Sequence, residues 1–172
     1  MTIQKNLYNL LMSGNETAWT GTSWVMEYDR VFEYTNAQVK QQVEALDDTA
    51  LAALLDLPTL FAYEKYVGAP VHVGRVTGIS RRQKEFAFTF NFDAAVAPIP
   101  HASFMQLLAE LDIDPKWEVN RSHWAVKNVN LADVLHIDPA IDLQAYSAAG
   151  RVDPRARLFK FFQGVGDKFL PA

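Results

Sequence analysis

The chain contains no cysteine among its 172 residues. This absence excludes disulfide bonds, thiolate zinc sites and catalysis by a cysteine nucleophile. The longest apolar run is far shorter than the ~20 residues that span a bilayer, and the first residues, Met-Thr-Ile-Gln-Lys-Asn, lack a basic region followed by an apolar signal core. We therefore expect a cytoplasmic protein of one main domain, because a chain of this length buries a sizeable core without a covalent staple.

Complete catalytic and cofactor-binding motifs are also missing. Gly74 and Gly78 lie inside an extended segment and not before a helix, which predicts a β-bulge or a strongly coiled strand and no phosphate-binding loop. His101 begins a single His-x-Ser motif, whereas the phosphoesterases that use this motif have two. His136 and Asp138 have no third metal ligand nearby. We predict no catalytic residue, no metal site and no cofactor, so the sequence favours a protein without enzymatic activity.

The most regular pattern in the chain covers residues 69–93. Two extended segments flank a polar tip at residues 81–84, and the second segment alternates four phenylalanines with smaller residues: Phe86, Phe88, Phe90 and Phe92. In a strand this spacing places the four rings on one face, and each ring contributes roughly 1.5–3 kcal/mol of stabilisation when buried. The pattern predicts a long central hairpin with a tip loop of four or five residues and an aromatic face covered by helices.

Shorter patterns on both sides of the hairpin predict the remaining elements. Apolar residues at helical spacing, with capping residues and helix-ending glycine or proline, indicate helices; alternation indicates strands. The helices are expected at residues 2–12, 35–46, 47–55, 59–67, 104–111 and 130–135 and after Pro154, and the strands at 24–34 and 117–129. We therefore predict an α+β fold, with an antiparallel sheet built on the long central hairpin and covered by several short helices.

Charge is distributed unevenly along the chain. The net charge is −4, yet residues 147–172 carry +3 and the preceding residues −7. We expect residues 1–146 to form the domain and residues 147–172 a basic aromatic tail with one helix, packed on its own domain, a second copy or an acidic partner. The tail residues expected to bind a partner are Arg155, Arg157, Phe159, Lys160 and Phe162.

One polar stretch, residues 117–131, contains the candidate ligand-binding residues. If it is a single strand, Arg121, His123 and Lys127 project from the same face and would hold a phosphate or carboxylate, with Arg121 as a bidentate clamp. In the alternative interpretation Arg121 pairs with an acidic residue, His123 bonds a backbone carbonyl and Lys127 is solvated. The sequence leaves both interpretations open.

The hairpin tip is a third candidate site. Arg81, Arg82 and Lys84 would let a basic β-ribbon enter a nucleic-acid groove, although charged loop tips are usually just solvated. The negative net charge argues against general nucleic-acid binding, since that affinity depends on lysine and arginine neutralising phosphates.

Two segments together resemble an uncharacterised bacterial module. They are Leu60-Phe-Ala-Tyr-Glu64 followed by Val73-Gly-Arg-Val-Thr-Gly-Ile79, and residues 117–127 leading into 129–131. In longer proteins this module precedes a TIR-like or nucleotide-binding domain associated with anti-phage defence. The resemblance covers about residues 55–135, with Asn128 and Asn130 where aspartates are expected. It implies a sensing or partner-binding part of a system whose catalytic effector lies elsewhere.

These observations lead to two hypotheses. The first is a non-enzymatic protein-interaction or sensor module that binds a protein partner or associates with itself and is part of a bacterial defence system. The second is a small-anion or nucleotide-binding domain, with hydrolytic activity as an option, that uses Arg121, His123 and Lys127.

Overall fold

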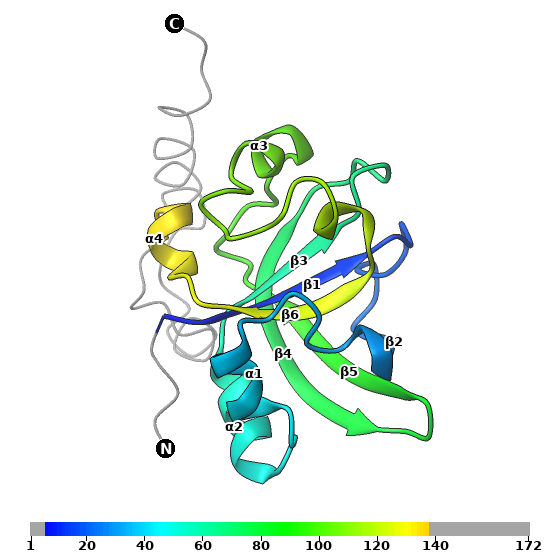
Figure 1. Ribbon diagram of the computed structural model, residues 1–172. Coiled ribbons are helices and arrows are strands. Elements are labelled where there is room, and N and C mark those ends of the chain that lie inside the picture. The colour runs from blue at the N-terminus through cyan, green and yellow to red at the C-terminus, as the bar shows by residue number, and fades with distance from the viewer. Residues whose placement is uncertain (1–5, 138–172) are drawn as a thin grey trace, which may run out of the picture.

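The computed structural model describes residues 6–137. The predicted C-terminal helix and the predicted partner-binding residues Arg155, Arg157, Phe159, Lys160 and Phe162 lie outside the described residues. Within residues 6–137, an open six-stranded sheet is combined with four α-helices, which confirms the predicted α+β class (Figure 1). In this part of the chain no helix has the length and apolar character needed to cross a membrane.

Strands and helices occur along the whole of the described chain. The strands are β1 (Tyr8–Ser13), β2 (Ser23–Glu27), β3 (Thr59–Tyr63), β4 (His72–Arg81), β5 (Glu85–Phe92) and β6 (His123–Lys127). The α-helices are α1 (Ala37–Val43), α2 (Asp48–Asp56), α3 (His101–Gln106) and α4 (Leu131–Leu135), and two 3-10 turns are η1 (Tyr28–Arg30) and η2 (Glu118–Asn120).

The sheet is mixed, in the order β2-β5-β4-β3-β1-β6. All neighbouring strands are antiparallel except β1 and β3, which are parallel because the chain returns through β2, α1 and α2 before it forms β3. The predicted antiparallel sheet is therefore confirmed only in part, because the β1–β3 pair is parallel. The long hairpin is confirmed as β4–β5, but only residues 82–84 separate its strands, and the Arg82 N–H donates to the Glu85 carbonyl at 2.9 Å.

Two segments predicted as helices, residues 2–12 and 59–67, form strands β1 and β3 where the structure describes them. Both strands lie in the interior of the sheet and are buried on both faces, so they read as continuous apolar runs without alternation. Such runs match a helical stripe as well as a strand. The correction therefore follows from the position of these strands in the sheet, which the local pattern does not encode.

The predicted strand at residues 24–34 is also too long. It ends at Glu27, and the chain then turns through η1. Phe32 and Tyr34 follow with φ angles of 62° and 55°, which a strand does not allow. Similarly, the predicted helix at 104–111 corresponds to the shorter α3, and the predicted strand at 117–129 shortens to β6.

Side-chain caps fix the start of three helices, within a residue or two of the starts that the sequence predicts. Asn36 accepts the Gln38 N–H at 2.9 Å and begins α1, and Asp47 accepts the Ala50 N–H at 2.8 Å and begins α2. Asn130 caps α4 in the same way. Each cap satisfies a backbone donor that the helix itself leaves free.

The sheet has an apolar core on each face. Phe88 and Phe90 lie on one face with residues of α1 and α2, while α3 and α4 pack on the other. Phe86, Phe88 and Phe90 are buried and Phe92 is half-buried, which confirms the aromatic face of the hairpin. Trp19, from the loop after β1, contacts Phe88 and Phe90 and donates its indole N–H to the Ala62 carbonyl at 2.7 Å. The aromatic face is thus covered by a loop tryptophan as well as by helices.

Candidate functional site

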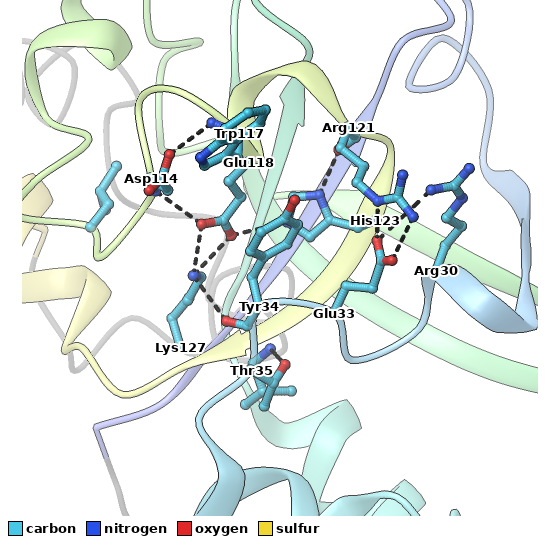
Figure 2. A network of polar contacts seen from close by, with 12 residues as sticks. Arg30, Glu33, Tyr34, Thr35, Asp114, Trp117, Glu118, Arg121, His123 and Lys127 are labelled. Carbon is cyan, nitrogen blue, oxygen red and sulfur yellow. Dashed lines mark hydrogen bonds and ion pairs between the residues drawn. The ribbon is translucent and has the colours of Figure 1, made fainter.

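Three charged side chains meet where β6 begins and ends. His123 and Lys127 lie four residues apart on β6 and project from the same face, and Glu118 reaches them from η2 (Figure 2). The Glu118 carboxylate lies 3.0 Å from His123 Nε2 and 2.8 Å from Lys127 Nζ. All three side chains are almost completely buried. We call Glu118, His123 and Lys127 the buried triad.

The carboxylate of Glu118 has several hydrogen-bond donors around it. Burial raises its pKa, but hydrogen bonds from His123, Lys127 and the backbone N–H of Asp114 together outweigh burial, and the pKa of Glu118 is lowered. The Asp114 N–H lies 3.0 Å from Glu118 Oε2. Glu118 is therefore a buried anion with its charge matched by neighbours, the arrangement that makes a buried charge tolerable.

His123 and Lys127 have all their polar atoms engaged. Nδ1 of His123 lies 2.6 Å from the carbonyl oxygen of Arg121, and Nε2 faces Glu118. Both neighbours are hydrogen-bond acceptors, so each ring nitrogen has a polar partner. Lys127 Nζ bonds both Glu118 oxygens and, at 3.1 Å, the Tyr34 carbonyl. The triad is thus internally satisfied and joins η2, β6 and the segment before α1.

Arg121 does not join His123 and Lys127, because it lies before β6 and its side chain points to another partner. Its Nε and Nη2 each donate to a Glu33 oxygen at 2.7 Å, which is a bidentate pair. The hydrogen bond from Arg121 lowers the pKa of Glu33 despite the opposing effect of burial, with Arg30 contributing at longer range. The structure therefore separates the three predicted ligand-binding cations into two ion-paired groups.

The alternative interpretation of these residues matches the structure at two positions. Arg121 pairs with an acidic residue, Glu33, and His123 contacts a backbone carbonyl. The expectation that Lys127 is solvated is wrong, since its side chain is 3% exposed. Lys127 is drawn inward because Glu118 provides a buried carboxylate within reach.

An open depression of about 470 Å³ lies beside the triad. Glu118 and Lys127 contribute to its lining, together with Tyr34 and the carboxylates Asp112 and Asp114. The Asp114 carboxylate accepts the N–H groups of Lys116 and Trp117, which lowers its pKa. Because the protons of Lys127 are already engaged and the remaining charges are acidic, the depression suits a donor or a cation better than the predicted anion.

The other histidines lie apart from one another. His72 stacks on Phe92 with ring centroids 4.2 Å apart, and burial lowers its pKa. His101 begins α3, and His136 ends α4 in the left-handed region. Within residues 6–137, no group of three His, Asp or Glu side chains is arranged to hold a metal ion; Asp138 lies outside this range.

The three basic residues of the hairpin tip have different neighbours. The guanidinium of Arg81 lies over the Tyr28 ring at 5.5 Å from its centroid, and Arg82 pairs with Glu85 at 3.1 Å. Lys84 is exposed, and its carbonyl accepts the Tyr28 N–H at 3.3 Å. The tip thus has one cation placed over an aromatic ring, one ion-paired and one in solvent.

The two edges of the sheet differ. The β6 edge is covered by residues 31–35: Val31 forms a parallel bridge with Trp124, and the Thr35 hydroxyl accepts the Val126 N–H at 2.9 Å. The Tyr34 carbonyl adds its bond to Lys127. Covering an edge in this way prevents another chain from pairing with it.

The β2 edge has no such cover among the described residues. Thr22 accepts the Phe90 N–H and Tyr28 donates to the Lys84 carbonyl, so the main-chain groups of the even-numbered residues point to β5. The N–H and C=O groups of Ser23, Val25 and Glu27 consequently point away from the sheet, and in residues 6–137 they have no hydrogen-bond partner. We call this row of groups the β2 edge; Figure 1 shows β2 at the margin of the sheet beside β5.

Sequence reasoning missed the acidic partners and the free edge. Glu33 and Glu118 were not singled out, although each neutralises a predicted ligand-binding residue. Trp117, which precedes Glu118, is 62% exposed, so the neighbouring sequence gives no signal that Glu118 is buried. Which main-chain groups of β2 point outward depends on how β2 pairs with β5, and no local sequence pattern contains that pairing.

Comparisons of the chain with protein-family models, with curated proteins and with solved structures found no significant match.

Proposed function

We propose that this chain is a protein-interaction module that receives an extended segment along the β2 edge and has no enzymatic activity of its own. The observation that supports the proposal is the outward row of backbone donors and acceptors at Ser23, Val25 and Glu27. Such a row is a template for an added strand, in which main-chain hydrogen bonds supply affinity.

The side chains of β2 add to this support. Natural edge strands are usually protected by lysine, proline or a bulge, and β2 has none of these. Its charged residue is Glu27, and Val25 is 40% exposed at the middle of the strand. An exposed apolar residue between free main-chain groups favours a partner strand with an apolar residue in the matching position.

The arrangement of charged groups also favours binding over catalysis. In the buried triad the carboxylate, imidazole and ammonium bond one another or backbone atoms, and water reaches them poorly. A general acid or base has to reach a substrate proton, and although Glu118 and Lys127 border the open depression, their polar atoms are already bonded to one another, to His123 or to backbone atoms. The triad instead has a structural role, because its ion pairs and hydrogen bonds join η2, β6 and the segment before α1.

A sensing role in bacterial defence is the part of the proposal that depends on the sequence resemblance alone. The tail residues Arg155, Arg157, Phe159, Lys160 and Phe162 remain a predicted second partner-binding element.

Display of random extended peptides tests strand addition directly. Peptides selected on the full chain should lose binding to Val25→Pro, because proline removes the central outward donor, and should keep binding to Val25→Ala, which retains it. Proline at this position removes no ladder bond to β5, since the Val25 N–H points outward. If the selected peptides bind Val25→Pro equally, or if no peptide is selected and the chain also does not pair through β2, the proposal fails.

The alternative function is binding of a small anion or nucleotide by Arg121, His123 and Lys127. It has less support, because the anion would have to displace Glu33 from Arg121 or Glu118 from the other two. A thermal-shift screen of phosphate and nucleotides on the full chain, with Arg121→Ala as control, tests it. A shift that disappears in Arg121→Ala would favour the alternative.

A further inference from the structure

We infer that the strand received by the β2 edge is β2 of a second copy of this chain, antiparallel and with Val25 opposite Val25. The inference rests on the proposed function, because it names the partner of the same edge. It is drawn from three observations: only the odd-numbered residues of β2 have outward main-chain groups, the side chains of β2 are self-complementary, and the opposite edge strand β6 is covered.

The positions of the outward main-chain groups restrict how two copies can pair. Outward main-chain groups occur only at the odd positions Ser23, Val25 and Glu27, so an odd residue must face an odd residue for bonds to form. With Val25 at the two-fold axis, Val25 faces its own copy and Ser23 faces Glu27 on both sides. All the outward donors and acceptors of β2 are then used in three hydrogen-bonded pairs.

Other symmetric registers are poorer. If the axis passes through Glu27, two carboxylates are directly opposite, which is destabilising. If the axis passes through Trp24 or Met26, one odd residue in each copy is left without a partner on the facing strand. The register centred on Val25 therefore satisfies the most backbone groups without opposing like charges.

The side chains are self-complementary in this register. On the solvent face, exposed Val25 packs on its own copy, and Glu27 lies opposite the hydroxyl of Ser23. On the core face, Trp24 lies opposite Met26 in the non-hydrogen-bonded pairs, where side chains approach most closely. Trp24 is half-buried in one copy, so pairing would cover more of its ring.

The opposite end of the sheet does not extend the assembly. Residues 31–35 cover β6, so after two β2 edges have paired, the β6 edge of each copy stays closed. An isologous contact of this kind closes on itself, whereas a head-to-tail contact would extend into a filament. The expected species is a two-fold dimer with one continuous sheet, in concentration-dependent equilibrium with the monomer.

Sedimentation of the full chain over a range of concentrations measures this equilibrium. Val25→Pro removes two N–H donors from the dimer, one per copy, and should weaken dimerisation by roughly 10- to 30-fold. Val25→Ala keeps both donors and should weaken it less. A dimer that is insensitive to Val25→Pro would overturn the inference, because its contact would lie elsewhere.

Disulfide trapping tests the register and uses the absence of native cysteine. Hydrogen-bonded antiparallel pairs have Cα atoms about 5.5 Å apart, within disulfide range. Val25→Cys alone should therefore cross-link two chains on mild oxidation. Ser23→Cys alone should not, because its two copies are four residues out of register, about 14 Å; mixed with Glu27→Cys it should. Cross-linking of Ser23→Cys with itself would refute the register.

The outcomes separate the inference from the proposed function. If the chain stays monomeric at all concentrations and Val25→Cys does not cross-link, the self-pairing inference is wrong. The proposed function survives that result if displayed peptides still bind and lose binding in Val25→Pro. If both the peptides and the dimer are absent, the β2 edge is not a binding surface and both proposals fail.

Discussion

Replacing Glu118 by glutamine is a direct test of the buried triad. The substitution keeps the size of the side chain but removes the charge that His123 and Lys127 share. It also places an amide NH₂ among donors, since Lys127 Nζ and the Asp114 N–H both donate to this carboxylate. The variant therefore combines an uncompensated buried charge with a donor facing a donor.

The expected loss follows from burial. Removing one partner of a buried ion pair typically costs about 3–5 kcal/mol, and side chains exposed by 3% or less, as in this triad, belong to that class. Since each 1 kcal/mol shifts the melting temperature of a chain of this size by roughly 2–4 °C, Glu118→Gln should lower it by roughly 10 °C. Urea unfolding followed by circular dichroism measures the free-energy difference directly.

Glu33→Gln provides the matched control. The same substitution there breaks a bidentate pair with Arg121, whose side chain is 42% exposed, so water can replace the lost contact. The loss should be clearly smaller than for Glu118→Gln. Adding Lys127→Met to Glu118→Gln should recover part of the stability, because it removes the unpaired ammonium. If Glu118→Gln costs no more than Glu33→Gln, the reasoning about burial is refuted.

Three further predictions concern other parts of the structure. Because the folded-state pKa of Glu118 is lowered, its contribution is complete above the usual glutamate pKa of about 4.3 and disappears as pH falls below it; the stability gap between wild type and Glu118→Gln should narrow over that range in urea titrations, and a constant gap would contradict this. A side chain at Gly74 would overlap the backbone of β5, whereas the space at Gly21 is empty, so Gly74→Ala should unfold at much lower urea than Gly21→Ala, and equal midpoints would show that β4 can shift. Tyr8→Phe removes a buried hydrogen bond to the Leu111 carbonyl and should cost about 1–3 kcal/mol of unfolding free energy, and an unchanged stability would mean that this carbonyl finds another donor.

Local sequence signals predicted the elements that depend on few distant contacts. The alternating phenylalanines of β5 and the capping residues of α1, α2 and α4 act within a few residues, and the strand and the three helix starts lie close to where they were predicted. The β4 glycines were predicted to mark a bulge, and the register shifts between Val76 and Gly78. These features are set by backbone geometry at the positions themselves.

Local sequence patterns gave wrong predictions where the position of a segment in the sheet determines its structure. The segments that form β1 and β3 are apolar on both faces because they are interior strands, and their sequences fit a helix equally well. The same limit applied to the candidate site. Arg121, His123 and Lys127 were identified as candidate ligand-binding residues, but their acidic partners were not. Glu33 is distant in sequence from Arg121, and Glu118 lies in the turn before β6. Only the fold brings each carboxylate close to its partner.

The segment of residues 31–35 links the buried triad to the proposed dimer. It leaves the β2 end of the sheet, crosses to the other end and closes the β6 edge through Thr35 and through the bond from Lys127 to the Tyr34 carbonyl. Lys127 is held in position for that bond by Glu118, so loss of the triad would weaken the cover of β6 as well as the core. A free β6 edge would offer a second pairing surface, and pairing at both ends of the sheet would let an assembly grow beyond two copies. The triad thus opposes such growth because it helps to keep the β6 edge closed.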